Sequence, residues 1–395
     1  MIKAAQKWLG GLRWILAGFI ACVLASPVSA QEPPYSRWFK YQSSITADWN
    51  IVGDPADPLR VSMRAKIEHK GPVKRVLVLY PRASSAYDIA ITKILEVFDE
   101  KELNAHITAI NFELKDARGK EVLKFAEQGK FDLIFSMGSE STAWLFDNYL
   151  GGSIPVVSVC SKDPVQLGQT KDYENGTGNN FAFTSLNMPV EVQLAYIVNL
   201  KPDLKNIAIL VDNKNVSAVQ TQAEPIAAHA RKNGIQVIMG SVQTPEKARE
   251  ELAKIVPDAI RQMRAKDPDL NNSVFLVTGS TSVFKEMKTI NEYSGHVPVV
   301  SMIPEIVTSG PDTAVVAMGI SFESNAHLAA IYGADILVGR SKADALKVGI
   351  VSPPDISISF AKAREIGLRV PFDLFETASF VYDYEGRPVR TSGRK

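Results

Sequence analysis

Small hydroxyl-bearing residues follow several predicted strands of this 395-residue chain, at the points where the strands end. Glycine at such a point lets the backbone approach a ligand, and serine or threonine adds hydrogen-bond donors without charge. Where the loop leads into a helix, the free backbone N–H groups favour a carboxylate or phosphate. The candidate ligand-binding residues at these strand ends are Ser139, Ser141, Thr142, Ser161, Asp163, Asn213, Ser280 and Ser282. The alternative is that the serines only cap helices, which requires no ligand.

Three further residues could contact a ligand through an aromatic ring or a carboxylate. Tyr87 and Asp88 come shortly after the first predicted strand. Tyr87 could stack on an aromatic or apolar ligand, and Asp88 could pair with an ammonium group. Glu305 follows another predicted strand and is a second candidate for the ammonium. The alternative for Tyr87 and Asp88 is that they are ordinary residues of a first helical turn.

No catalytic motif accompanies these residues. The sequence lacks G-x-S-x-G, H-E-x-x-H, a phosphate-binding P-loop and a complete G-x-G-x-x-G. Its five histidines have no metal-ligand spacing. We therefore predict no catalytic residue, no metal and no cofactor, although a secreted α/β hydrolase or isomerase remains an alternative. Cys160 is predicted to be a buried apolar residue.

Several of the loops with hydroxyl groups belong to a strand–helix–strand sequence pattern that occurs twice, called the repeated device below. In each copy an apolar strand ends in Gly-Ser, a helical segment follows, and a second apolar strand opens with proline. The copies cover residues 131–158 and 274–301, and their glycines, Gly138 and Gly279, lie 141 positions apart. This order is typical of a βαβ unit in a parallel sheet. Strand and helix patterns alternate through most of the chain, including a helix expected over 357–367, so we predict two doubly wound α/β lobes.

The N-terminus has the pattern of a secretory signal peptide. Lys3, Lys7 and Arg13 precede or flank an apolar run, and Val28–Ala30 is a small-residue cleavage site. The expected location is therefore the periplasm, and acylation at Cys22 as a lipoprotein is the alternative. Without residues 1–30 the chain is slightly acidic and has no basic stripe, so nucleic acid is not an expected partner. We expect a monomer.

The expected domain plan follows from these patterns. Residues 31–72 are predicted to be an N-terminal extension that is at best partly ordered. Residues 73–185 with 302–350 are expected to form the first lobe, and 186–301 with 351–395 the second.

In order and spacing, several segments within about residues 73–380 resemble the substrate-binding proteins of ABC transporters, in the branch related to tryptophan/tyrosine uptake proteins. The matching segments are Met137–Ser139, Ile154–Val157, Asp163–Val165, Asn175–Gly178, Leu200–Pro202, Ala329–Gly339 and Ala363–Leu368. The resemblance implies the class I fold of periplasmic binding proteins, with two lobes joined by crossing strands. It also implies that the lobes close on a small, amino-acid-like ligand and deliver it to a membrane permease.

The chain departs from the family pattern at the ends of two strands. Ser139 replaces the usual threonine, and Cys160, Ser161 and Lys162 form a more polar stretch than expected. These departures affect the identity of the ligand more than the fold. A sensor that reports a ligand to a membrane signalling partner is the alternative function.

Overall fold

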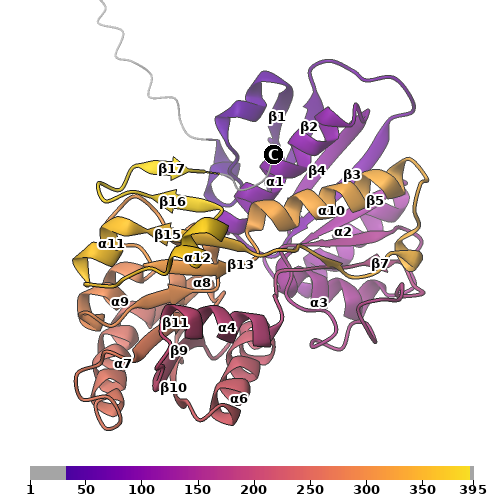
Figure 1. The fold of residues 1–395 in the computed structure, drawn as a ribbon. Helices are drawn as coiled ribbons and strands as arrows, with labels where there is room; N and C mark the ends of the chain where they lie inside the picture. Colours follow the sequence, from indigo (N-terminus) through magenta and orange to yellow (C-terminus); the bar gives the residue numbers. More distant parts are fainter. Residues whose placement is uncertain (1–32, 392–395) are drawn as a thin grey trace, which may run out of the picture. The chain divides into compact units, whose positions relative to one another are not determined.

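The computed structural model describes residues 33–391, so the expected signal peptide and Cys22 lie outside the described residues. Two large sheets organise this part of the chain (Figure 1). The predicted α/β class with two largely parallel sheets is confirmed. Here "first lobe" means the first sheet with its helices, and "second lobe" means the second sheet with its helices.

The first sheet has seven strands in the order β1-β2-β4-β3-β5-β6-β7. Their bounds are β1 Trp49–Asp54, β2 Asp57–Ala65, β3 Lys74–Tyr80, β4 Ala105–Asn111, β5 Leu133–Met137, β6 Val156–Val159 and β7 Phe181–Ala182. The pairs β1–β2 and β2–β4 are antiparallel, and the other neighbouring pairs are parallel. The helices of this part are α1 Ser85–Glu100, α2 Asp116–Gln128 and α3 Gly138–Tyr149.

Strand β3 shows why the central strands are apolar throughout. Val76, Val78 and Tyr80 belong to the hydrophobic cluster on one face of the sheet. Leu77 and Leu79 belong to the cluster on the other face. Because helices cover both faces of a parallel sheet, alternate residues of one strand are all buried. The continuous apolar run in the sequence therefore places β3 in the middle of a doubly covered sheet.

The second sheet has eight strands in the order β10-β9-β11-β12-β13-β15-β16-β17. Their bounds are β9 Asn206–Asp212, β10 Gln236–Val242, β11 Ser273–Val277, β12 Val299–Ser301, β13 Val316–Gly319, β15 Asp355–Ser359, β16 Phe380–Tyr382 and β17 Pro388–Arg390. The helices are α4 Val190–Leu200, α5 Val216–Ala218, the π-helical turn Val219–Ala223, α6 Glu224–Lys232, α7 Ala248–Met263, α8 Thr281–Phe284, α9 Met287–Ser294, α11 Phe360–Glu365 and α12 Phe372–Thr377.

Both copies of the repeated device form the predicted βαβ unit. In the first lobe, β5 and β6 are parallel neighbours connected through α3. In the second lobe, β11 and β12 are parallel neighbours connected through α8 and α9.

The chain passes between the lobes near residues 186, 320 and 351. The short strands β8 Thr184–Ser185 and β14 Gly349–Ile350 pair in a small separate sheet. Helix α10, Phe322–Leu337, follows β13 of the second sheet but packs against α1, β5 and β6 of the first lobe (Figure 1). The expectation that residues 302–350 all belong to the first lobe therefore needs correction, because β13 pairs with β12 and β15.

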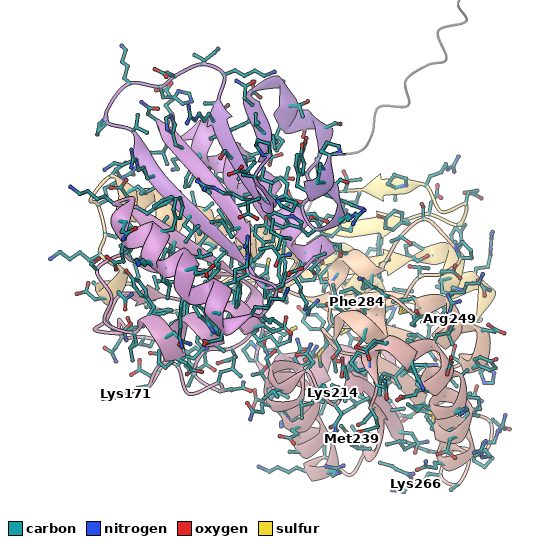
Figure 2. All side chains as sticks on the ribbon, turned by 180° about the vertical axis from the view of Figure 1, so that it is seen from behind. Lys171, Lys214, Met239, Arg249, Lys266 and Phe284 are labelled. Atoms are coloured by element: carbon teal, nitrogen blue, oxygen red, sulfur yellow. The ribbon has the colours of Figure 1, made fainter. Side chains whose placement is uncertain are left out.

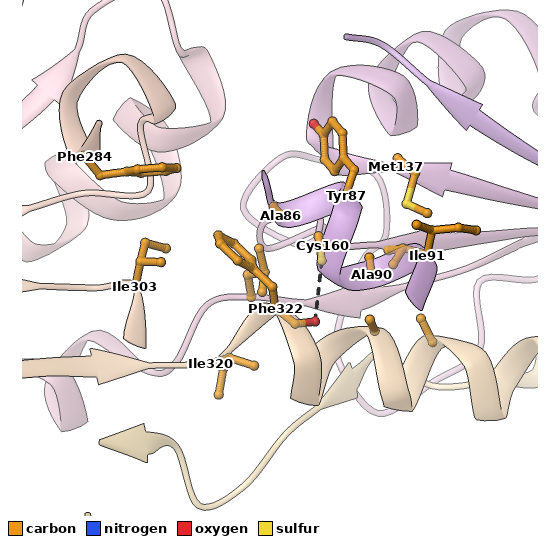
Figure 3. Packing of buried hydrophobic residues seen from close by; sticks show 14 of the residues in the cluster. Ala86, Tyr87, Ala90, Ile91, Met137, Cys160, Phe284, Ile303, Ile320 and Phe322 are labelled. Carbon is orange, nitrogen blue, oxygen red and sulfur yellow. Dashed lines mark hydrogen bonds between the residues drawn. The ribbon is translucent and has the colours of Figure 1, made fainter. Parts of the chain in front are cut away.

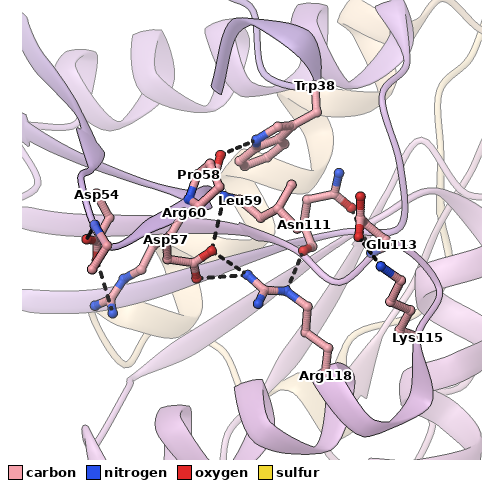
Figure 4. Close-up of polar contacts among 11 residues, drawn as sticks. Trp38, Asp54, Asp57, Pro58, Leu59, Arg60, Asn111, Glu113, Lys115 and Arg118 are labelled. Carbon is pink, nitrogen blue, oxygen red and sulfur yellow. Dashed lines mark hydrogen bonds and ion pairs between the residues drawn. The ribbon is translucent and has the colours of Figure 1, made fainter. Parts of the chain in front are cut away.

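Residues 34–65 are not the loosely ordered extension that we expected. After two short 3-10 helices, Pro34–Arg37 and Ser43–Ala47, the chain forms β1 and β2, and β2 pairs with β4 of the first sheet. Arg118 of α2 holds β2 through hydrogen bonds of 2.8 and 2.9 Å from Nη2 to both carboxylate oxygens of Asp57 (Figure 4). The missed signal is the alternation in β2, where Val61 and Met63 are buried and their neighbours are more exposed.

The expected helix over 357–367 also needs correction. Residues 355–359 form the buried strand β15, and the helix begins only at Phe360. Both faces of β15 are buried, so Ser357 and Ser359 lie inside beside Ile356 and Ile358. The Ser359 side chain then caps α11 by accepting a hydrogen bond from the backbone N–H of Lys362 at 3.2 Å. The alternation of serine and isoleucine was thus a strand signal.

Candidate functional site

A pocket lies between the two lobes at the carboxyl ends of their strands. Its walls come from loops after β3, β5, β6 and β8 and from the start of α10 on one side, and from loops after β9, β11 and β12 on the other. The lining residues are Arg82, Ser84, Ala86, Tyr87, Gly138, Ser139, Glu140, Cys160, Lys162, Leu186, Asn215, Ser217, Gln222, Gly279, Thr281, Phe284, Ile303 and Phe322. Open α/β sheets bind ligands at this edge, so this pocket is the candidate site.

The pocket has a narrow inner part and a wider outer part. The centre of a water molecule can occupy about 40 Å³ of the inner part. The total space that protein atoms leave unfilled there is about 510 Å³. An outer compartment, in which the centre of a water molecule can occupy about 410 Å³, shares Arg82, Glu140, Asn215 and Thr281 with the inner part. The outer compartment is charged, with Lys214 and Lys285 on its wall. Figure 2 labels Lys214 and Phe284, which contribute from the same lobe to the outer and inner parts.

Aromatic and aliphatic side chains form one part of the inner wall, beside polar and charged side chains. Tyr87 and Phe322 face the pocket from one side, and Phe284 and Ile303 from the other (Figure 3). All four are at most 6% exposed. They belong to one hydrophobic cluster that extends from the first sheet to the second. A ligand with an apolar or aromatic body would fit this wall.

Tyr87 is the predicted residue that the structure places most clearly at the pocket. It is 5% exposed, and its ring contacts Tyr80 edge-on with centroids 5.8 Å apart. Burial raises the pKa of its hydroxyl above the usual range. Gly138 has a φ of 75° and leaves no room for a side chain, because a Cβ atom there would overlap the Tyr87 hydroxyl. The glycine after β5 thus makes room for Tyr87.

Ser139 also lines the pocket, where it connects two loops. Its Oγ accepts a hydrogen bond of 2.9 Å from the backbone N–H of Lys162. Ser161 lies beside it, with the two hydroxyl oxygens 3.4 Å apart. The loops after β5 and β6 are therefore joined at the pocket wall.

Three further hydroxyl groups of the two devices point into their own lobes. Ser141 donates to the carbonyl oxygen of Leu79 at 3.2 Å, and Thr142 donates to that of Gly138 at 2.9 Å. Ser280 accepts from the backbone N–H of Asp212 at 3.2 Å. All three side chains are fully buried and outside the pocket wall. Ser280 precedes α8, but its side chain makes no capping hydrogen bond, so the capping alternative does not describe it either.

Ser282, Asp163 and Asn213 lie farther from the inner pocket. Ser282 lines the outer compartment and donates to Asp212 Oδ2 at 2.7 Å. Asp163 is buried in its own loop, where it accepts from Tyr173 Oη at 2.6 Å. Asn213 is exposed and donates to the Gln243 side chain at 3.1 Å. The asparagine that lines the pocket is Asn215 instead.

The two carboxylates suggested for an ammonium group are engaged elsewhere. Asp88 accepts from the backbone N–H of Lys40 at 2.9 Å, and burial raises the pKa of its carboxyl to about 6. Glu305 accepts from the backbone N–H of Phe322 at 2.5 Å, while its Oε2 is buried without a hydrogen-bond partner. Burial raises the Glu305 pKa to about 8. Neither residue lines the pocket.

Three charged residues that sequence reasoning missed lie at the pocket. Arg82 Nε and Glu140 Oε2 form an ion pair at 2.7 Å. Lys162 is 8% exposed, and its Nζ donates to the carbonyl oxygen of Gly279 in the opposite lobe at 3.3 Å. Burial lowers the pKa of Lys162 to about 8. The polar stretch of residues 160–162 was the available signal, but only the fold shows which of its side chains enters the cleft.

The arrangement suits binding. Cys160 is buried, and burial raises its thiol pKa well above the usual value, so the thiolate that would act as a nucleophile is disfavoured. The prediction of a buried cysteine is thereby confirmed. Within residues 33–391 no cluster of His, Cys, Asp and Glu could hold a metal ion. In the same part of the chain, no helix is both long and apolar enough to cross a bilayer.

Solved structures share the fold at low sequence identity. One is an ABC domain from Streptococcus pneumonia in complex with L-Trp, with 18% identity, 78% of this chain and 100% of that chain covered, and a TM-score of 0.62. A conserved domain protein from Vibrio cholerae has 18% identity, covers 78% and 99%, and has a TM-score of 0.63. A ligand-free, open substrate-binding protein with adhesive properties from Clostridium difficile has 18% identity, covers 76% and 97%, and has a TM-score of 0.57.

No curated protein sequence matches the chain. A family model does match, and it covers residues 87–381, most of both lobes. Its members are binding proteins, not enzymes, and they deliver a small ligand to an ABC permease. Together with the two lobes and the pocket between them, this match shows that the chain belongs to the ABC transporter substrate binding protein family.

Proposed function

We propose that this substrate-binding protein captures an amino-acid-like ligand between its lobes in the periplasm and acts as a monomer. The observation that carries the proposal is the composition of the inner pocket. The buried ammonium of Lys162 lies at the same pocket as the aromatic wall of Tyr87, Phe284 and Phe322. A free amino acid has a carboxylate that can pair with the Lys162 ammonium and a side chain that can contact the aromatic wall.

The ammonium group of an amino acid has a candidate partner in Glu140. Glu140 lines both parts of the pocket and uses Oε2 for Arg82. Its Oε1 has no hydrogen bond to another described side chain, so it can accept one from a ligand. The L-Trp held by the Streptococcus pneumonia neighbour supports the same ligand class, although at 18% identity that likeness concerns the fold alone.

Ligand binding should stabilise the closed arrangement of the lobes. Residues of both lobes line the pocket, so a ligand that contacts both favours the closed form over an open one. At a concentration 100 times its dissociation constant, a ligand adds about 2.7 kcal/mol to the free energy of unfolding. For a chain of this size that corresponds to a rise in melting temperature of about 5–10 °C.

A thermal-shift screen of the protein without residues 1–30 tests the ligand class. The panel contains the twenty L-amino acids, short peptides, and sugars as a chemically different group. We expect one or more amino acids to raise the melting temperature, with calorimetry confirming a single site. A response to sugars alone, or to no compound, would contradict the proposed ligand class.

Cell fractionation tests the proposed location. The pattern of residues 1–30 supports export and cleavage after Ala30. We expect the mature protein in the periplasmic fraction, with an N-terminus at Gln31 and a monomeric mass in sedimentation. A membrane-associated form that is lost on Cys22→Ser would support the lipoprotein alternative instead.

A further inference from the structure

Lys162 places a buried positive charge at the pocket. The residue is more than nine-tenths buried, and its Nζ makes one hydrogen bond, to the Gly279 carbonyl at 3.3 Å. An ammonium group has three donors, and burying a charge is unfavourable unless it is paired and hydrogen-bonded. Two donors of Lys162 are therefore available at the pocket.

No carboxylate of residues 33–391 forms an ion pair with Lys162. The acidic residue that most affects it is Glu140, which is already paired with Arg82 at 2.7 Å. Because Arg82 carries its own positive charge, the Arg82–Glu140 pair compensates Lys162 only in part. An anionic group of a ligand would supply the missing partner.

The outer compartment carries further charged groups. Lys214 and Lys285 line the outer compartment, and neither forms an ion pair with a carboxylate of the described chain. Of its carboxylates, Glu286 pairs with Arg249 at 3.1 Å, while Asp212 accepts a hydrogen bond from the neutral Ser282 hydroxyl, which is not an ion pair. Across both compartments the lining cations Arg82, Lys162, Lys214 and Lys285 outnumber the carboxylates of Glu140, Asp212 and Glu286 by one, which favours an anionic ligand.

The backbone at Lys162 is held in place. Ser139 Oγ accepts the Lys162 N–H at 2.9 Å, and the Gly279 carbonyl on the opposite lobe receives the side chain. Loops from both sheets thus fix the two ends of this residue. The narrow inner space and the aromatic wall suit one flat anionic group on an apolar body better than a bulky phosphate.

We propose that Lys162 is the residue that selects the ligand's carboxylate, which replaces or joins the Gly279 carbonyl as the partner of Nζ when the lobes hold the ligand. This inference rests on the proposed function and deepens it. It makes the carboxylate, rather than the amino group, the feature that a ligand must have.

Three compounds distinguish the contribution of the ligand's carboxylate to binding from that of its ammonium group. L-tryptophan has both, indole-3-propionate has only the carboxylate, and tryptamine has only the ammonium. We expect calorimetry with the wild-type protein to show binding of the two acids, and of tryptamine at least 10-fold more weakly. Lys162→Met should weaken both acids about 10- to 100-fold, the range for a hydrogen bond to a charged group. Lys162→Arg should retain more affinity than Lys162→Met.

Lys171→Met is the matched control, since Lys171 is exposed on the first lobe and outside the pocket (Figure 2). It should bind like the wild type. The Lys162→Met variant should fold, because removal of a buried charge with one hydrogen bond is tolerated when a side chain of similar length fills its place. Its melting temperature without ligand shows this directly.

The pH dependence of the wild type is a second measurement that requires no variant. Burial lowers the pKa of Lys162 to about 8, and Glu140 and Arg82 are the charged groups that act on it. A carboxylate binds the protonated form, so affinity for indole-3-propionate should be constant between about pH 6 and 8 and fall up to 10-fold per unit above about pH 8. The probe has no amino group that titrates in this range.

Equal binding of the acids by Lys162→Met and wild type would overturn the inference, as would equal binding of tryptamine and L-tryptophan by the wild type. If an uncharged or cationic compound from the wider panel binds and no acid does, capture between the lobes stands and the role of Lys162 fails. If no compound binds, both fail.

Discussion

The hydroxyl group of Tyr87 occupies the space that a Cβ atom at Gly138 would need. This relationship connects the first repeated device with the ligand pocket, since both residues line it. Gly138→Ala should therefore displace Tyr87 and strain a backbone with φ of 75°. We expect a loss of about 1–3 kcal/mol in the free energy of unfolding, together with weaker ligand binding.

Gly151→Ala is the control for that variant. Gly151 has a φ of 79° but no atom within 4 Å of the added Cβ. It should show the backbone strain alone, with ligand affinity unchanged. Denaturant unfolding and calorimetry of both variants separate the two effects. Equal ligand affinity in the two variants would show that the position of Tyr87 does not matter for binding.

The serine of the second device has a structural role that can be tested. Ser280 is fully buried in the loop after β11, and its Oγ accepts the backbone N–H of Asp212 at the end of β9. Ser280→Ala leaves that N–H without an acceptor, which costs about 1–3 kcal/mol. We expect a lower melting temperature without ligand and an unchanged ligand-induced rise. A lost response to ligand at unchanged stability would instead place Ser280 in the binding site.

Glu305 should make stability depend on pH. Burial raises its pKa from the usual range to about 8, with nearby Asp355 adding to the rise. A raised carboxyl pKa means that the folded state holds a proton that the unfolded state has lost. The contribution is complete below about pH 4.5 and disappears as pH rises through 8, by up to about 1.4 kcal/mol per pH unit.

Glu305→Gln keeps the acceptor for Phe322 N–H but does not titrate. Unfolding free energies of wild type and variant at pH 5, 6.5 and 8 measure the effect. The variant should gain stability relative to the wild type as pH rises. Parallel pH profiles for the two proteins would show that Glu305 is ionised in the folded state throughout.

The N-terminal segment should contribute strongly to the stability of the first lobe. Trp38 is 5% exposed, contacts Tyr80 edge-on at 5.2 Å, and donates from Nε1 to the Pro58 carbonyl at 3.0 Å (Figure 4). Trp38→Ala should reduce the free energy of unfolding by about 3–5 kcal/mol. Val52→Ala on the neighbouring strand β1 is the control, because Val52 is 62% exposed and the change should stay within about 0.5 kcal/mol.

Calorimetric unfolding of both variants checks this prediction. If Trp38→Ala melts like the wild type, residues 34–65 do not stabilise the sheet they join. Tyr80 also contacts Tyr87, so ligand affinity of Trp38→Ala reports whether the segment helps to position the pocket wall.

The parts of the fold that the sequence predicted well are those with uninterrupted apolar runs or with a repeated sequence pattern. β3 and β9 contain continuous apolar runs because both faces of a parallel sheet are covered, and every inner residue is then apolar. The repeat of Gly-Ser and proline-led strands predicted both βαβ units. β2 and β15 were missed because each alternates apolar with polar residues over a short stretch, and in β15 the polar residues are serines buried beside isoleucines.

The residues of the candidate site were also predictable from the sequence only in part. The sequence by itself determined that hydroxyl-bearing loops end the strands of two similar lobes, and local pattern suffices for that because strand ends are a local property. Only the tertiary structure decided which side chains face the cleft. Ser139 and Tyr87 do, while Ser141, Thr142 and Ser280 bond inward.

Lys162 shows the physical reason most clearly. Its burial, its bond to Gly279 of the opposite lobe and its lack of a carboxylate partner within residues 33–391 depend on loops 117 positions apart in sequence. No spacing rule connects two such loops, since their meeting depends on how the two sheets are joined. The sequence thus determined the two lobes, and the packing between them determined what they can hold.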